Sequence, residues 1–333
     1  MKAIRLLGNG KAKMVDVAKP ELPEGYAMIE VAAAGICGTD IEMLLNSPEP
    51  IGYIPGHEAV GTIVEMNGIK GFNIGDRVLL NCHITCGKCK YCKIEARIFC
   101  KDLQVIGFGI DGADAEYIAM PKENLTRIPD DISFDQALLL TDALGTPYNA
   151  VKRSGIKKGD KVGVTGVGPL GIMCVISARY FSADVIAIDL VPERLKQAKK
   201  FGALYTINPE KEDYKSLSDK FTDGEGLDII IECSGSGKAV QMALELLKVR
   251  GKLIQVGVCT EVTLDLFKEV VAKELHIIGS RGFVDSEIKE IIDLIRKKPE
   301  ISEAITHRYK LGQAQEAFDM AESKNGIKVI FEP

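Results

Sequence analysis

The sequence predicts an α/β protein in which a β-rich lobe comes first and a doubly wound parallel sheet follows. Residues 1–130 are rich in Val, Ile, Gly and Pro, and their short alternating runs are typical of strands separated by turns. From residue 133 onward, helical patterns alternate with short buried strands, which is typical of a parallel sheet covered by helices. A chain of 333 residues is long enough for two such domains.

The first lobe is expected to contain several short strands. Apolar runs bounded by turn residues occupy residues 27–31, 59–64 and 76–80. Because no long helical pattern interrupts these runs, we expect a compact all-β lobe up to about residue 130.

The second half is expected to alternate regularly between the two kinds of element. Helices are predicted at residues 135–140, 145–153, 169–180, 192–201 and 238–247, and strands at 161–165, 185–189, 228–232 and 252–256. A last segment, from about residue 285, carries two helices and ends in a strand at 328–331.

Composition argues against several classes of protein. The net charge of -5 provides no basic face for nucleic acid. No apolar run reaches the length of about 18 residues that a membrane span needs. The first residues read as a strand rather than a signal peptide. Nine cysteines without such a signal indicate a reducing compartment, so we expect a cytoplasmic protein.

Four closely spaced cysteines predict a structural zinc site. Their pattern, C-x2-C-x2-C-x7-C, lets one loop wrap four thiolates round a single ion, and such a closed shell does no chemistry. The alternative is four ordinary cysteines, two of them in a disulfide. The predicted ligands are Cys86, Cys89, Cys92 and Cys100, while Cys82, Cys174, Cys233 and Cys259 are expected to be small buried hydrophobes.

A glycine fingerprint predicts a dinucleotide site. Gly166-x-Gly168-x-x-Gly171 follows the strand expected at 161–165 and opens a helix. The first glycine permits the tight turn, the second lets the backbone approach a pyrophosphate, and the third lets helix and strand pack closely. The free N–H groups of the helix would then face the phosphates.

Asp189 ends the next predicted strand, where an acidic side chain accepts hydrogen bonds from ribose hydroxyls and repels a 2′-phosphate. Its other expected role is to cap the helix that begins at Pro192. No arginine directly follows Asp189, which favours NAD over NADP. The residues expected to bind the cofactor are Gly166, Gly168, Pro169, Leu170, Gly171, Asp189 and Arg194.

Cys37 and His57 are candidates for a second zinc site in the first lobe. A thiolate and an imidazole suit zinc, but a catalytic zinc needs three protein ligands and one open position. On their own, the two residues fit a core cysteine and a loop histidine better than they fit a metal site, because a third ligand is missing.

Together these motifs resemble the zinc-dependent medium-chain alcohol dehydrogenases. They occur in the family's order and span almost the whole chain. The matching segments are Cys37–Asp40, Gly56–Glu58, the cysteines from Cys86 to Cys100, Gly112–Tyr117, Gly166–Gly171, Glu232–Gly235 and Ile305–Arg308.

The resemblance implies a GroES-like β-barrel catalytic domain interrupted by a Rossmann domain. We expect the GroES-like domain at residues 1–148, the NAD-binding Rossmann domain at 149–284, and a return to the catalytic domain at 285–333. It also implies a homodimer or homotetramer that acts on a small-molecule alcohol, with no nucleic-acid or membrane partner.

The resemblance further implies a third ligand for the catalytic zinc, near the junction of the two domains. The matching position is Asp142, although this residue could instead cap the helix expected at 145–153. Glu58 follows the ligand His57 and lies close to the metal in relatives, where it exchanges onto the ion in some cases.

The expected chemistry is oxidation of a CH–OH group. Zinc would lower the pKa of a bound alcohol, and hydride would pass to the nicotinamide. Thr39 matches the family's hydroxyl relay for the released proton. Where many relatives place a histidine that completes the relay, this chain has Glu42.

The substrate is less closely defined by the sequence. His83 matches a histidine that lies near the substrate in threonine 3-dehydrogenases, but it could equally be a structural loop residue. We therefore predict an NAD-dependent zinc enzyme that oxidises a polyol, sugar or secondary alcohol. The alternatives are an L-threonine 3-dehydrogenase and, in another class, a non-catalytic binding protein of the same fold.

Overall fold

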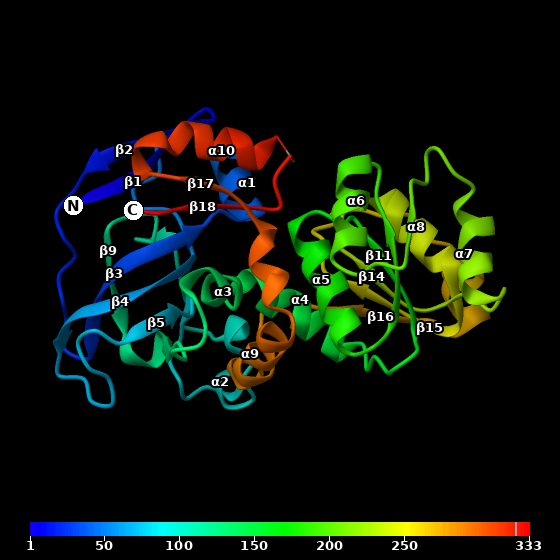
Figure 1. Ribbon diagram of the computed structural model, residues 1–333, viewed down its shortest axis with the longest axis horizontal. Helices are drawn as coiled ribbons and strands as arrows, with labels where there is room; N and C mark the ends of the chain where they lie inside the picture. Colours follow the sequence, from blue (N-terminus) through cyan, green and yellow to red (C-terminus); the bar gives the residue numbers. More distant parts are fainter. Residues whose placement is uncertain (324) are drawn as a thin grey trace. The chain divides into compact units, whose positions relative to one another are not determined.

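The computed structural model describes residues 1–323 and 325–333, which form two compact units (Figure 1). The first unit comprises Met1–Ala143, Val284–Ile288 and Ile295–Pro333. The second comprises Leu144–Phe283 and Lys289–Leu294. Within the described part of the chain, no helix combines the length and apolar character needed to cross a bilayer.

The first unit is built on a seven-stranded sheet with the order β10-β5-β4-β3-β18-β17, in which β9 also pairs with β3. The C-terminal strand β18 is antiparallel to β3 and parallel to β17, so the end of the chain lies beside a strand from its beginning (Figure 1). The strands of this sheet are β3 (Tyr26–Gly35), β4 (Glu58–Asn67), β5 (Arg77–Leu80), β9 (Tyr117–Pro121), β10 (Leu125–Arg127), β17 (Ile305–Tyr309) and β18 (Lys328–Phe331).

Smaller elements complete this unit. The hairpin β1–β2 and the three-stranded sheet β6-β7-β8 stand beside the main sheet. Phe318 of α10 and Phe331 of β18 are fully buried and belong to the same apolar core as β3 and β4. The remaining bounds are β1 (Lys2–Gly8), β2 (Lys11–Asp16), α1 (Gly38–Asn46), β6 (His83–Ile84), α2 (Lys90–Lys93), β7 (Gln104–Ile106), β8 (Gly109–Ile110), α3 (Phe134–Leu139) and α10 (Ala314–Glu322).

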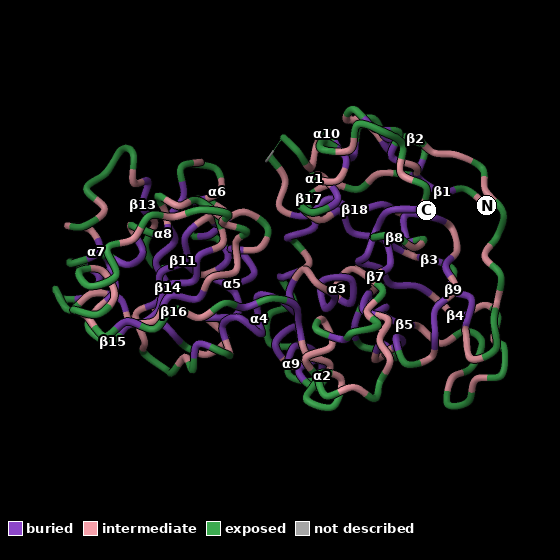
Figure 2. Tube along the Cα trace, turned by 180° about the vertical axis from the view of Figure 1, so that it is seen from behind, coloured by how far each residue is buried: buried purple, intermediate pink, exposed green. Residues whose placement is uncertain are grey.

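The second unit is a six-stranded parallel sheet with the order β13-β12-β11-β14-β15-β16. The central strands β11 and β14 are buried, whereas α7 lies at the exposed periphery (Figure 2). The elements are β11 (Lys161–Thr165), α5 (Pro169–Tyr180), β12 (Asp184–Ile188), α6 (Pro192–Lys200), β13 (Tyr205–Ile207), α7 (Tyr214–Thr222), β14 (Leu227–Glu232), α8 (Gly237–Leu246), β15 (Leu247–Gln255) and β16 (His276–Gly279); α4 (Asp142–Arg153) and α9 (Ile288–Lys297) cross the unit boundaries.

Strand order explains where a ligand can bind in this sheet. From β11 the chain passes through α5 to β12 on one side, and β14 pairs on the other side of β11. Such a reversal leaves a crevice at the carboxyl ends of the strands, which is where open α/β sheets bind dinucleotides.

The prediction of an all-β first lobe was wrong, because the helices α1 and α2 both lie within it. Helix α1 begins directly after Cys37, because the carboxylate of Asp40 accepts a hydrogen bond from the Cys37 backbone N–H, as in a capping box. The elements β13, α7 and β16 were not predicted. Most of β16 is exposed, and β13 is only three residues long, so neither strand leaves a buried apolar run in the sequence.

Candidate active site and metal centres

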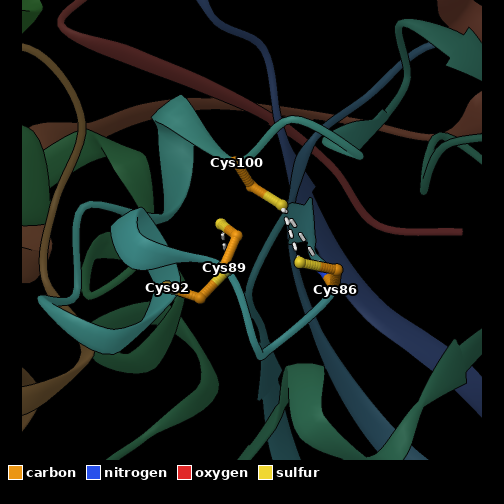
Figure 3. A group of neighbouring side chains, drawn as sticks. All are labelled: Cys86, Cys89, Cys92 and Cys100. Carbon is orange, nitrogen blue, oxygen red and sulfur yellow. Dashed lines mark hydrogen bonds between the residues drawn. The ribbon is translucent and has the colours of Figure 1, made fainter.

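The four predicted structural ligands lie on one loop and gather round a common point (Figure 3). Their sulfur atoms all lie within 4.8 Å of one another. The Sγ–Sγ distance is 3.5 Å both for Cys89–Cys92 and for Cys86–Cys100. With Zn–S bonds of about 2.3 Å, a tetrahedral site places its sulfurs about 3.8 Å apart, so the loop needs little adjustment to hold zinc.

One thiol of this loop, that of Cys89, is unusually acidic. Hydrogen bonding from the Cys92 backbone N–H lowers the pKa of Cys89 to about 6, so this thiol ionises readily at neutral pH. All nine cysteines are free in the structure, and none of them forms the disulfide considered as an alternative.

A second cluster with ligand chemistry lies in the same unit. One ligand atom from each of Cys37, His57, Glu58 and Asp142 lies within 4.8 Å of the others. Cys37 precedes α1, His57 and Glu58 stand at the start of β4, and Asp142 is the first residue of α4. Three separate segments thus bring a thiolate, an imidazole and two carboxylates together, a donor set that suits zinc.

Asp40 holds two of these ligands in place. Its Oδ2 accepts a hydrogen bond from the Cys37 N–H at 2.8 Å, and its Oδ1 lies 3.2 Å from Nδ1 of His57. The other ring nitrogen of His57, Nε2, therefore faces the cluster and lies 4.0 Å from the Asp142 carboxylate. Burial lowers the pKa of His57, but Asp40 and Cys37 together raise it well above its ordinary value, so the imidazole is unusually basic and a stronger ligand.

Sequence reasoning did not assign this role to Asp40. The signal was present, since an acid three residues after Cys37 is placed to reach back to the residue before a helix.

Lys328 is a second residue that sequence reasoning missed. Its Nζ donates hydrogen bonds to the Ile36 carbonyl at 3.0 Å and to Glu58 Oε1 at 2.7 Å. The side chains of Lys328 and Glu58 are 5% and 1% exposed. Burial lowers the pKa of Lys328, but the charges of Glu58 and Cys37 raise it above its ordinary value, so the ammonium stays protonated. A lysine opening an otherwise apolar strand, Lys-Val-Ile-Phe, was the available signal.

The other predicted residues of this site, Thr39, Glu42 and His83, lie outside the cluster of four ligand candidates. Thr39 is exposed on the first turn of α1, and Glu42 is exposed on the same helix. His83 is buried in β6, and burial lowers its pKa, with the Asp142 charge opposing the change. His83 is therefore a neutral imidazole within electrostatic reach of the Asp142 carboxylate. The roles predicted for Thr39, Glu58, His83 and Asp142 stay predictions.

The glycine fingerprint adopts the geometry that a dinucleotide site needs. Gly166 has φ +75, and a Cβ there would lie 2.6 Å from Ser234. A Cβ on Gly171 would lie 2.2 Å from the Gly166 carbonyl oxygen, so only glycine allows α5 to approach β11 this closely. Gly168 precedes α5 and Pro169 is its first residue, which points the free N–H groups of Leu170 and its neighbours out of the helix.

Asp189 stands beside this fingerprint at the end of β12. Its Oδ2 accepts a hydrogen bond from Val167 N–H at 2.8 Å, and its Oδ1 accepts one from Val191 N–H at 2.9 Å. Asp189 therefore braces the fingerprint loop and the turn before α6, and does not bond to the first helical N–H groups as a helix cap would. Arg194 Nη1 lies 4.0 Å from the same carboxylate.

Comparison with known proteins identifies the family. The sequence pattern described as "Alcohol dehydrogenase GroES-like domain" matches residues 23–130, and that described as "Zinc-binding dehydrogenase" matches residues 169–297. The chain belongs to the zinc-dependent medium-chain alcohol dehydrogenases. The predicted family, fold class and enzyme class are thereby confirmed, and the alternative of a non-catalytic protein is not supported.

Full-length relatives support the same assignment for this dehydrogenase. It is 32% identical to a sorbitol dehydrogenase of Halalkalibacterium halodurans, with 100% of this chain and 99% of the relative covered. It is 35% identical to an L-threonine 3-dehydrogenase of Shewanella woodyi, with 95% of each chain covered.

Solved structures show the same fold. The alcohol dehydrogenase of Thermus sp. ATN1 matches with a TM-score of 0.93 at 29% identity, over 100% of this dehydrogenase and 99% of that chain. A zinc-binding dehydrogenase of Sinorhizobium meliloti, solved with NADP, matches with a TM-score of 0.89 at 27% identity, over 100% and 99%.

Proposed function

We propose that this dehydrogenase oxidises a CH–OH group of a polyol, sugar or secondary alcohol, with NAD as the hydride acceptor. The observation that carries the proposal is the convergence of Cys37, His57 and Asp142, from three segments, on one partly buried point. Three protein ligands leave a fourth position of a tetrahedral zinc for substrate, as catalytic zinc sites require. When bound there, zinc acts as a Lewis acid that makes a hydroxyl group more acidic.

We assign the third ligand position to Asp142 rather than Glu58. Both oxygens of Glu58 already have partners, because Oε1 pairs with Lys328 at 2.7 Å and Oε2 is 3.4 Å from Thr141 Oγ1. Asp142 has a 28% exposed side chain at the N-terminus of α4, 4.0 Å from His57 Nε2. Asp142 is thus placed to bind the ion, while Glu58 is held by a buried ammonium.

The chain's own residues would then handle the proton. Thr39 Oγ1 is exposed two residues after the ligand Cys37, where a hydroxyl group can accept the substrate proton and donate its own onward. Glu42, one turn further along α1, can receive that proton as a carboxylate. Asp40 holds Cys37 and His57 in position during this transfer.

The preference for NAD is supported by Asp189. Its buried carboxylate lies at the end of β12, where a 2′-phosphate would meet a negative charge. The Arg194 guanidinium would favour a phosphate, but it already faces Asp189 at 4.0 Å. We therefore expect discrimination in favour of NAD, even though a relative of this fold binds NADP.

L-Threonine, oxidised at its 3-hydroxyl, is the second candidate substrate. Several L-threonine 3-dehydrogenases are 33–35% identical over nearly the full chain. His83 supports this candidate as well, because a neutral imidazole near the metal site can accept a hydrogen bond from an ammonium group.

A substrate panel tests both candidates. Polyols, sugars, secondary alcohols and L-threonine would be supplied with NAD or NADP, and the reduced cofactor followed by absorbance. A higher kcat/KM for a polyol, sugar or simple alcohol supports the first candidate, and one for L-threonine supports the second. No turnover of any CH–OH compound by the zinc-loaded protein would contradict the proposal.

We also propose a cytoplasmic homodimer or homotetramer. The reducing compartment is supported by the nine free thiols. The oligomer is supported by apolar exposure at the β16 edge of the sheet, where Ile277 is 46% exposed, and along Leu266–Val271, where Phe267 is 73% exposed. Light scattering coupled to size exclusion measures the subunit number, and a monomer would contradict this part.

A further inference from the structure

The loop from Asn81 to His83 is fixed by hydrogen bonds along its whole length. Asn124 Nδ2 donates to the carbonyl oxygens of Asn81 at 2.7 Å and His83 at 2.9 Å. The Asn81 N–H donates to the Asn124 carbonyl at 2.8 Å, and the His83 N–H donates to Asn81 Oδ1 at 3.0 Å. The backbone position of His83, from which its imidazole extends, therefore depends on the side chains of Asn81 and Asn124.

This loop borders the candidate catalytic site. His83 pairs with Val105 of β7, and Phe108, whose N–H donates to the Val105 carbonyl at 3.0 Å, packs against His57 with ring centroids 5.1 Å apart. Cys82 and His83 are themselves buried. We refer to Asn81–His83 as the pocket loop.

Asp285 connects the pocket loop to the four-cysteine loop. Its Oδ1 accepts a hydrogen bond from Asn81 Nδ2 at 2.5 Å, and its Oδ2 pairs with Arg97 Nη1. Arg97 Nη2 also donates to the His83 carbonyl at 3.2 Å. The Arg97 side chain is only 16% exposed, and Arg97 begins the 3-10 turn Arg97–Phe99 that leads directly into the ligand Cys100.

A neighbouring contact also joins this segment to the four-cysteine loop. Ser286, next to Asp285, donates a hydrogen bond to Glu95, which lies between the ligands Cys92 and Cys100. The short segment Val284–Ile288 thus holds the four-cysteine loop at two points and the pocket loop at one.

We propose that Arg97 and Asp285 are positioning residues that couple the four-cysteine metal site to the substrate pocket. A metal on Cys100 fixes the turn that carries Arg97, Arg97 fixes the Asp285 carboxylate, and Asp285 fixes Asn81 and hence His83. The structural metal thereby acts on substrate binding through one charged hydrogen-bond chain. This proposal rests on the proposed function only in taking His83 to contact the substrate.

The first test replaces Asp285 by asparagine, which keeps the size of the side chain. Its amide N–H group then faces either Asn81 Nδ2 or Arg97 Nη1, and two donors cannot form a hydrogen bond with each other. We expect the KM of the best alcohol of the panel to rise about tenfold, the scale of one lost charged hydrogen bond. The kcat, the KM for NAD and the zinc content should stay near wild type. The matched control is Asp131→Asn, which breaks an exposed pair with Arg296 in the same unit and should leave every KM unchanged.

The second test asks whether the cluster acts through this chain. Cys100→Ser should raise the substrate KM in the wild-type and Asp131→Asn backgrounds but add little in the Asp285→Asn background. If Cys100→Ser does not fold, cadmium at the cluster of the wild-type enzyme replaces it as the perturbation. If Cys100→Ser raises the substrate KM by the same factor in the Asp285→Asn background as in the wild type, the coupling is overturned.

The third test needs no substrate. Zinc release to the chromogenic chelator 4-(2-pyridylazo)resorcinol should show a slow phase from the cluster that is about tenfold faster in Asp285→Asn and Arg97→Met, because coupling is reciprocal. A wild-type release rate in both variants would overturn the proposal. If the wild-type enzyme oxidises no alcohol, the proposed function fails, and this measurement alone decides the coupling.

Discussion

At the residue scale, the assignment of the third zinc ligand is open to a direct test. Asp142→Asn removes the carboxylate that lies 4.0 Å from His57 Nε2, so the enzyme should lose one zinc ion per subunit together with its activity. The matched variant, Glu58→Gln, should keep that zinc. Elemental analysis of both proteins measures the difference. Zinc loss from Glu58→Gln with retention in Asp142→Asn would transfer the ligand role to Glu58.

A second prediction concerns the buried ammonium of Lys328. Lys328→Met leaves the Glu58 carboxylate buried without its ion-pair partner, which should reduce the free energy of unfolding by about 3–5 kcal/mol. The double variant Lys328→Met/Glu58→Gln should recover much of that loss, because no charge is then left unpaired. Denaturant unfolding provides the measurement. Lys310→Met, at an exposed position of the same C-terminal region, is the control and should cost little.

A third prediction concerns the proton relay. Thr39→Val keeps the size of the side chain but removes its hydroxyl group, so both zinc ions should stay while alcohol oxidation falls on the order of 100-fold. The pH profile of kcat should change with the rate, since the route of the proton is altered. If rate and pH profile both match the wild type, Thr39 has no part in the relay.

At the element scale, Glu290 of α9 links that helix to α4. Its carboxylate accepts hydrogen bonds from Lys152 Nζ at 2.8 Å and from the Tyr148 hydroxyl group at 2.8 Å. Lys152 first, and then Tyr148, lower the pKa of Glu290 below its ordinary value. A lowered pKa in the folded state means that this contribution to stability is complete above the unfolded pKa, about 4.3, and is lost as the pH falls through the folded value.

We therefore expect Glu290→Gln to reduce the Tm at pH 7 and the difference from wild type to shrink below about pH 4.3. The effect should be small, because the Glu290 side chain is 47% exposed and solvent screens the pair. Thermal melts of both proteins across pH 3–7 measure it, and both carry the same metal sites. A difference in Tm between the two proteins that grows as the pH falls would contradict this prediction.

At the scale of the whole molecule, the sequence predicts what is local and misses what depends on distant pairing. The cysteine loop, the glycine fingerprint and strand β11 are each encoded in one short segment, and the structure places them as expected. Lys328 acquires its role only because β18 pairs with β3, which brings residues from opposite ends of the chain together. The Asn81–Asp285–Arg97 chain is hidden for the same reason.

The two metal sites of the molecule should differ in how tightly they hold zinc. The four-cysteine loop offers four thiolates, whereas the second cluster offers a single thiolate with an imidazole and a carboxylate. Soft thiolates bind zinc more tightly than a hard carboxylate, so a chelator should remove the second ion first. Activity should disappear with that ion while the Tm changes little, because one open-sided site contributes less to folding than a closed one.

Removal of the remaining ion should then lower the Tm, since metal binding at the closed site supplies folding free energy. Cys100→Ser should mimic this second step without chelator, losing one zinc ion and thermal stability. Elemental analysis, activity and thermal melts on the same chelation series provide the order of events. A fully active enzyme with a single zinc ion per subunit, or simultaneous loss of both ions, would contradict two sites of unequal affinity.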